Sequence, residues 1–268
     1  MRKLLRRLLP PRVRRPLARA LREAPHRIRD FLPDLFDAIR SPRGRPPVPP
    51  ARLRFRVSGT SSRRVFLDVG RSAAADILRG FEAGRASGRD YPRWLDFGCG
   101  SGRISHYLVG LPAVRELHGT DVDADAIAWA ARNLREGRYS INASKPPLEF
   151  PSSHFDVVVA GSVFTHLDEE PQRAWLAEVA RLLRPGGLLI ACTHSPNLTF
   201  MRPDLTQSQH TALAGCGFLF APGGGAFNDD GAFHSRQYLE REWGKVFRPC
   251  LFEEYGYCRF QDLSVWEV

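Results

Sequence analysis

A glycine-rich segment near the middle of the chain carries the residues best suited to holding a nucleotide-like ligand. Residues 94–103 read WLDFGCGSGR, so an apolar run enters Gly-x-Gly-x-Gly and then the start of a helix. Glycines let the backbone turn sharply and let a ligand lie directly against it. The N-terminus of the following helix offers free N–H groups and a partial positive charge. The pattern therefore predicts a ligand site at a strand-to-helix turn.

A carboxylate stands where such a site needs one. Asp121 closes the next expected strand, 23 residues after Gly98, which is about where an acid reaches a ribose diol. Two alternatives compete with this interpretation. The glycines could form a tight structural turn and nothing more, or they could serve a dinucleotide. The dinucleotide fingerprint G-x-G-x-x-G needs glycine where this chain has Arg103.

Residues 90–195 resemble the class I, Rossmann-like S-adenosylmethionine-dependent methyltransferases through four motifs in the family's order. LDFGCGSGR resembles the first motif and GTDVD, residues 119–123, the second. LEFPSSHFDVVV, residues 148–159, resembles the approach to the fourth strand, and RLLRPGGLLI the helix, turn and strand that close the core. A weaker likeness continues to the C-terminus. The resemblance implies an S-adenosylmethionine-dependent enzyme.

The resemblance also implies roles for individual cofactor-binding residues. Asp96, Gly98 and Gly100 would line the methionine end of S-adenosylmethionine. Asp121 would hold the ribose hydroxyls, where a carboxylate accepting two donors makes strong, charge-assisted contacts. Val122 would pack on the adenine ring.

Two further positions follow from the same resemblance. Ser162, just past the fourth strand, would lie near the sulfonium, although it could equally be a polar strand cap. Asn142–Ser144 lies where the family contacts the adenine edge, but many members carry an acidic residue there and this chain does not.

His166 is the candidate catalytic residue, because the loop after the fourth strand faces the site. Methyl transfer requires alignment and exclusion of water, and a general base helps only when the acceptor must lose a proton. His194 is a second candidate, and His234 is expected to begin a helix and to cap it. A purely structural histidine is the competing interpretation. The histidines and cysteines show no metal-ligand spacing, so no metal is expected.

Strands and helices are expected to alternate around these residues. The strands are apolar on both faces, which is typical of a parallel sheet covered by helices on both sides. We therefore expect an α/β, Rossmann-like, doubly wound and mainly parallel sheet with an antiparallel C-terminal strand. Residues 197–233 are expected to be a long connection that could act as a lid. Helices are expected over residues 72–88, 104–109, 123–136 and 171–184, and strands over 93–97, 114–120, 155–161, 188–193 and 261–266.

The charge divides the chain into a basic N-terminal arm and a mildly acidic body. Residues 1–56 hold 17 basic and 4 acidic side chains, a net charge of +13, whereas residues 57–268 hold 22 and 25, a net charge of −3. SPRGRPPVPP, residues 41–50, is typical of a linker. We expect an arm over 1–50 and one domain over 51–268. The arm could contact an anionic membrane surface, act as a mitochondrial-type presequence, or be a solvated extension. Nucleic acid is disfavoured, because residues 1–30 contain no aromatic residue for stacking.

Composition excludes other classes of protein. No apolar run approaches the ~18–20 residues of a membrane-spanning helix. Five cysteines without a C-x-x-C pair fit a reducing, cytoplasmic setting, with peripheral membrane contact through the arm as an option.

The function expected is methyl transfer to oxygen or nitrogen of a small molecule, glycan or lipid-linked intermediate. The alternative is a catalytically silent binding or scaffold subunit. The oligomeric state stays open.

Overall fold

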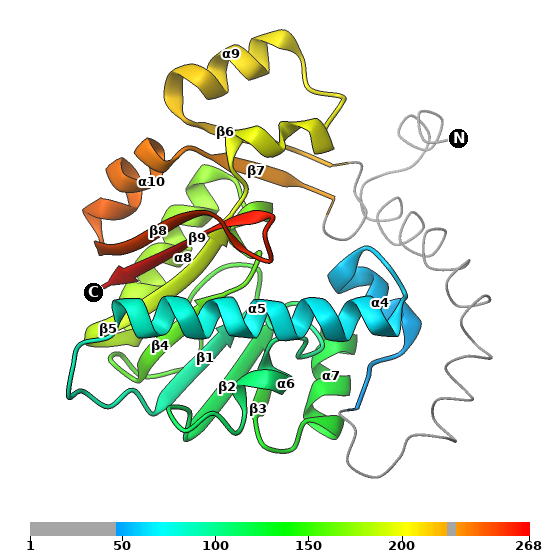
Figure 1. Cartoon of the computed structure of the whole chain (residues 1–268), viewed down its shortest axis with the longest axis vertical. Coiled ribbons are helices and arrows are strands. Elements are labelled where there is room, and N and C mark those ends of the chain that lie inside the picture. Colours follow the sequence, from blue (N-terminus) through cyan, green and yellow to red (C-terminus); the bar gives the residue numbers. More distant parts are fainter. Residues whose placement is uncertain (1–46, 224–228) are drawn as a thin grey trace.

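The computed structural model describes residues 47–223 and 229–268, and its centre is a seven-stranded sheet (Figure 1). The strand order is β3-β2-β1-β4-β5-β9-β8, and β9 is antiparallel to both of its neighbours. The pairs from β3 to β5 are parallel, which confirms the expected fold class. The strands are β1 (Arg93–Phe97), β2 (Glu116–Asp121), β3 (Arg138–Ile141), β4 (Phe155–Ala160), β5 (Leu183–Thr193), β8 (Arg248–Tyr257) and β9 (Gln261–Glu267).

The helices of the described residues vary widely in length. They are α4 (Ala51–Ser58), α5 (Arg63–Gly84), α6 (Ser105–Leu108), α7 (Ala124–Asn133), α8 (Glu169–Leu182), α9 (Gln207–Cys216) and α10 (Arg236–Glu242). Short 3₁₀ turns occur at η1 (Phe164–His166), η2 (Pro196–Met201) and η3 (Trp243–Lys245). A separate two-stranded hairpin joins β6 (Phe218–Ala221) to β7 (Gly231–His234).

The core lies on both faces of the sheet, because its central strand is apolar on both sides. Every residue of β4 is buried. Val157 and Val159 pack toward α5, whereas Val158 and Ala160 pack toward α8 and α10. Each valine buried in this way stabilises the fold by about 1.5–3 kcal/mol relative to exposure. Figure 1 shows α5 running across one face of the sheet, with α8 behind it.

The first long helix and the last parallel strand both start earlier than the sequence indicated. The helix expected at 72–88 is α5, which begins at Arg63, after Ser62 caps it by accepting the Val65 N–H, and ends at Gly84. The strand expected at 188–193 is the second half of β5. Leu183 already pairs with Phe155, and Leu188 with Val157, so Arg184–Gly187 forms a bulge within the strand. Leu183, which is paired in the sheet, and Arg184 separate the end of α8 from the Pro185-Gly186-Gly187 turn.

The long connection expected over 197–233 contains regular helices and strands in its described residues. These residues contain most of η2, all of α9 and β6, and most of β7, and a capping box between Thr206 and Gln209 starts α9. A small apolar cluster around Leu213 and Phe233 holds this unit together. His234 does not begin a helix. It ends β7, and Ser235 is the residue that caps α10.

The N-terminal predictions are only partly covered by the structure. Residues 1–46, which include most of the basic arm and the first part of the linker, lie outside the described residues. Pro49 is buried, and its carbonyl accepts a hydrogen bond from Arg54 at 2.5 Å. Within residues 47–223 and 229–268, no helix combines the length and the apolar character that a membrane crossing needs.

Candidate active site

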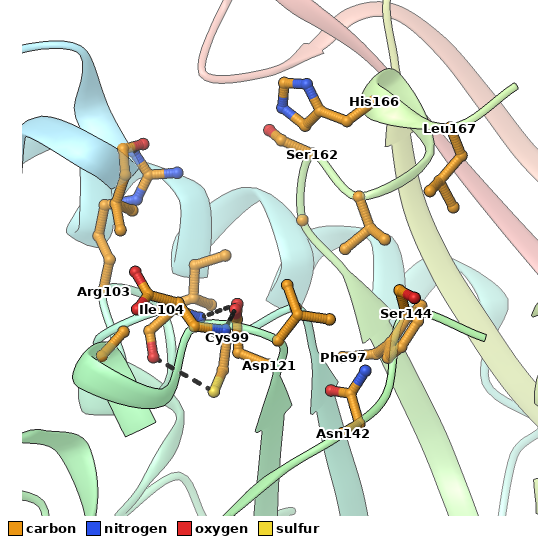
Figure 2. Close-up of a pocket in the computed structure, with 18 of the residues that line it drawn as sticks. Phe97, Cys99, Arg103, Ile104, Asp121, Asn142, Ser144, Ser162, His166 and Leu167 are labelled. Atoms are coloured by element: carbon orange, nitrogen blue, oxygen red, sulfur yellow. Dashed lines mark hydrogen bonds between the residues drawn. The ribbon is translucent and has the colours of Figure 1, made fainter. Parts of the chain in front are cut away.

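A cavity of about 270 Å³ opens at the carboxyl ends of β1, β2 and β4 (Figure 2). This volume lies just below the roughly 300–1,000 Å³ of most small-molecule pockets. Parallel strands that diverge around a switch in strand order create such a crevice. Its walls come from the glycine loop, the ends of the strands, η1, α4 and α8. Its lining residues include Val57, Gly98, Gly100, Arg103, Asp121, Val122, Asn142, Ser144, Ser162, His166 and Trp175.

The glycine loop is shaped so that only glycine fits at its two leading positions. Gly98 and Gly100 have φ values of 74° and 55°, a region that side chains disfavour. A Cβ on Gly98 would stand 2.4 Å from Cγ2 of Val163, and one on Gly100 would stand 3.0 Å from Cγ2 of Val57. The loop is anchored to β2, because the N–H groups of Gly98 and Cys99 both donate to the Thr120 carbonyl. Its backbone is therefore bare toward the cavity.

Asp121 sits at the tip of β2 with its carboxylate on the cavity wall. Oδ2 accepts the Gly100 N–H at 2.7 Å, and Oδ1 accepts the Asp123 N–H at 2.8 Å. Burial raises the pKa of this carboxyl, and the backbone donors oppose that shift. Each oxygen retains a lone pair for a ligand hydroxyl. Beside it, the side chain of Val122 is 52% exposed, which leaves an apolar surface for a flat ring.

Asp96 lies behind the wall of the cavity, contrary to the expectation that it lines it. Its side chain is 1% exposed, and Oδ2 accepts the Ser105 hydroxyl at 2.5 Å. Burial raises the pKa of Asp96 to about 6. The residue lies one position before the end of β1 and ties that strand to α6, so it supports the glycine loop from behind.

Ser162 and His166 lie together on the wall opposite the glycine loop (Figure 2). Ser162 has a φ of 62°, which is strained for a serine. Its N–H donates to Sγ of Cys192, and its hydroxyl donates to Oε1 of Gln261 at 2.8 Å. These contacts from β5 and β9 fix the direction of the serine oxygen.

His166 ends η1 and is held by the chain before β7. Its Nδ1 lies 2.9 Å from the carbonyl oxygen of Asp230. A carbonyl can only accept, so Nδ1 carries the proton. Burial lowers the pKa of His166 and favours the neutral ring, although the Asp230 carbonyl opposes that shift. In the neutral ring, Nε2 is then an unprotonated acceptor.

The two other histidine candidates are not brought to the cavity lining. His194 is 8% exposed, its ring packs on Phe233, and burial lowers its pKa to about 4. His234 is fully buried, shares a hydrogen bond with Gln172, and has a pKa lowered to about 3. Both are neutral core histidines. No three histidine, cysteine or acidic side chains within the described residues are grouped as metal ligands would be.

Several wall residues escaped the sequence analysis. Val57 comes from α4, which lies about 40 residues before the glycine loop and carries no motif. Trp175 is on the core face of α8 and reaches the cavity beyond Phe97. Arg103 follows the third glycine directly, so its position alone was a signal that it would lie at this edge. Gly98, Gly100, Asp121, Val122, Ser162 and His166 do meet around one cavity.

Helix α4, which precedes all of the sequence motifs described above, closes over this site. Arg56 of α4 donates to both carboxylate oxygens of Asp123, at 3.0 and 2.8 Å, and both side chains are 4% exposed. Asp123 caps α7 and stands two residues after Asp121. The ion pair therefore connects α4 to the loop that carries the ribose-binding candidate.

Comparison with known proteins gives matches centred on these same residues. A methyltransferase-domain family model matches residues 95–191. A ubiquinone biosynthesis O-methyltransferase from Bradyrhizobium sp. (strain ORS 278) is 34% identical over 107 residues, which are 39% of this chain and 41% of that protein. A malonyl-[acyl-carrier protein] O-methyltransferase from Paenibacillus sp. (strain JDR-2) is 28% identical over 155 residues, 55% of each chain. The chain thus spans only about half of these relatives.

Solved structures share the fold. A SAM-dependent methyltransferase from Methanosarcina mazei superposes with a TM-score of 0.53 at 20% identity, covering 67% of this chain and 93% of that one. At that identity the likeness concerns the architecture alone.

The residues around the cavity fit S-adenosylmethionine. Gly98 and Gly100 line the cavity with backbone that carries no side chain, so a ligand can lie directly against it. The Asp121 carboxylate suits a ribose diol, and the exposed Val122 suits a purine ring. The sheet order, the glycine loop and Asp121 agree with the methyltransferase-domain match at residues 95–191, and together they support a class I methyltransferase domain that uses S-adenosylmethionine.

Proposed function

We propose that this protein transfers a methyl group from S-adenosylmethionine to a hydroxyl oxygen of an organic acceptor, with His166 as the general base. One observation carries the proposal. His166 lines the cavity beside Ser162 as a neutral imidazole, with Nδ1–H held by the Asp230 carbonyl and Nε2 left to accept a proton. A hydroxyl acceptor needs such a base, because the oxygen must lose its proton as it is methylated.

The cofactor supplies an electrophilic methyl group on a sulfonium, so the protein's own task is one of positioning. Ser162, fixed by Gln261 and Cys192, presents its oxygen toward the same part of the cavity. Asp121 holds the ribose, the glycine loop lines the methionine end, and Val57 and Trp175 exclude water from two sides. Nitrogen acceptors that are already unprotonated would gain little from His166, which is why we favour oxygen.

We propose a small molecule, a glycan or a lipid-linked intermediate as the acceptor. Two of the relatives matched are named O-methyltransferases, one of ubiquinone biosynthesis and one acting on malonyl-[acyl-carrier protein]. Among the described residues that line the cavity, the acidic and basic side chains are two aspartates and one arginine. This balance of charge does not favour binding of a polyanion such as nucleic acid.

The test is transfer of a radiolabelled methyl group to a panel of acceptors. The panel contains phenols, carboxylic acids, sugars, lipid-linked sugars and primary amines. We expect label on hydroxyl-bearing acceptors, and loss of that label in His166→Gln. Label confined to amines would overturn the choice of oxygen. Binding of S-adenosylhomocysteine without transfer to any member would favour the alternative of a silent scaffold subunit.

A further inference from the structure

Arg103 is a buried cation on the wall of the cavity. It follows the third glycine of the loop and is 9% exposed. Among the described residues that line the cavity, it is the only lysine or arginine. The proposed function gives it no role so far.

The guanidinium of Arg103 has no carboxylate partner among the described residues. Its Nη1 donates to the carbonyl of Val57 at 3.2 Å and to the hydroxyl of Ser58 at 3.4 Å, and both contacts are long. Its Nε has no hydrogen-bond partner although it is buried. Arg56, the neighbouring buried arginine, is by contrast paired with Asp123 at 2.8 Å. An unpaired buried charge is costly, and proteins normally pair it or use it to bind an anion.

The surroundings of Arg103 identify which end of the cavity it serves. Its positive charge lowers the pKa of Asp96 at the end of β1 and that of Tyr257 at the end of β8, and in both cases burial acts more strongly in the opposite direction. Asp121 and Val122, at the end of β2, mark the nucleoside end. Arg103 follows the glycine loop beyond β1, and its guanidinium reaches Val57 and Ser58 at the end of α4, so it lies on the glycine-loop side of the cavity, where the amino-acid part of the cofactor would extend.

The position of Arg103 is set by close packing against α5. A Cβ on Gly70 would stand 2.6 Å from the Arg103 carbonyl oxygen and 3.1 Å from its Cγ. The missing side chain at Gly70 therefore lets α5 lie directly against this residue. Such packing holds the stem of the arginine from behind and reduces its freedom before any ligand arrives.

We propose that Arg103 binds the carboxylate of the methionine part of the cofactor. The inference rests on the proposed function, because it assumes that S-adenosylmethionine occupies the cavity. A planar guanidinium and a carboxylate pair through two parallel hydrogen bonds, which a lysine cannot reproduce. Arg103 is then the residue by which the site distinguishes the complete cofactor from nucleosides that lack the amino-acid part.

Calorimetric titration with two ligands tests this assignment. S-adenosylhomocysteine carries the carboxylate, whereas 5′-methylthioadenosine has the same nucleoside and thioether without it. In Arg103→Met we expect affinity for S-adenosylhomocysteine to fall by about tenfold to a hundredfold, the range of a lost charged hydrogen bond. Affinity for 5′-methylthioadenosine should stay within about twofold, which also shows that the variant is folded. Arg103→Lys should recover part of the loss.

A matched control removes the same charge outside the cavity. Arg52→Met deletes a cation of α4 that pairs with Asp125 on the surface, and it should leave both affinities unchanged. Equal weakening of both ligands in Arg103→Met, or no weakening of either, would overturn the role of Arg103. Failure of the wild type to bind either ligand would instead overturn the proposed function.

Discussion

The pH dependence of the reaction should depend on the imidazole of His166. Burial lowers its pKa below the ordinary value of about 6.5. A base acts only when it is unprotonated, so kcat/KM should rise with pH through a midpoint below 6.5 and stay level above it. In His166→Gln we expect kcat to fall by roughly 10²–10⁴-fold and the acid limb to disappear. A pH–rate profile of both proteins on one identified acceptor is the measurement.

Cofactor affinity, in contrast, should not depend on His166. S-adenosylhomocysteine should bind His166→Gln within about twofold of the wild type, since the ring is placed toward the acceptor. A kcat within about threefold of the wild type, with an unchanged profile, would leave positioning as the whole of the catalysis.

Asp121 should govern binding of the nucleoside. Asp121→Ala removes the acceptor of two ribose hydroxyls and of the Gly100 N–H, so we expect affinity for S-adenosylhomocysteine to drop at least about tenfold. The same substitution at Asp90, whose side chain is 76% exposed, changes the charge equally and should have no effect. Here 5′-methylthioadenosine should weaken as well, which separates this residue from Arg103. Titration calorimetry provides all of these affinities.

Among the elements around the cavity, α4 is the one whose closing of the cavity can be tested separately from the rest of the site. Arg56→Met leaves the buried Asp123 carboxylate without its arginine, a change that typically costs about 3–5 kcal/mol for a buried pair. We expect faster amide hydrogen exchange over residues 51–58 and weaker binding of S-adenosylhomocysteine, because Val57 no longer closes the cavity. Arg52→Met breaks an exposed pair worth at most about 1 kcal/mol and should leave the exchange unchanged. Equal exchange in both variants would contradict a closing role for α4.

The elements that the sequence predicted well are those whose pattern is local. β1 was placed at its observed bounds, and β4 within one residue, because an apolar run ending at glycine identifies a buried strand. α4 was missed because its buried face includes Arg54 and Arg56, whose partners lie elsewhere in the chain or on the backbone, so no apolar period marks it. The start of β5 was misplaced because only the pairing with Phe155 reveals that the strand continues through Pro-Gly-Gly.

Much of the candidate site could be predicted, because the order of the motifs in the sequence indicates which strands carry the site residues at their ends. Gly98 and Ser162 each follow a strand and Asp121 ends one, and parallel strands end at one edge of a sheet, so these residues had to meet. The burial of Asp96 was not predictable, because it depends on the Ser105 hydroxyl turning back toward β1. The contacts of Gln261 with Ser162 and of Asp230 with His166 were equally hidden, since they join residues 99 and 64 positions apart.

At the scale of the whole molecule, the arm and the domain should be separable. Deleting residues 1–46 keeps Pro49, whose carbonyl anchors Arg54, and removes most of the basic surplus. We expect a cooperative thermal melt and an affinity for S-adenosylhomocysteine within about threefold of the full chain, together with weaker binding to anionic liposomes. Sedimentation with vesicles of neutral and anionic lipid measures the last effect. A protein that no longer melts cooperatively would place the arm within the core.

The insertion of β9 between β5 and β8 also has a consequence for protein synthesis. Gln261, which directs the Ser162 hydroxyl, lies on this strand, and β9 is the last strand of the sheet along the chain. A ribosome therefore makes the glycine loop, Asp121 and His166 well before the residue that completes their surroundings. A nascent chain that has emerged only as far as β5 holds the nucleoside-binding motifs but lacks the support behind the serine. Competence for the proposed methyl transfer should thus appear only after β9 has left the exit tunnel and entered the sheet.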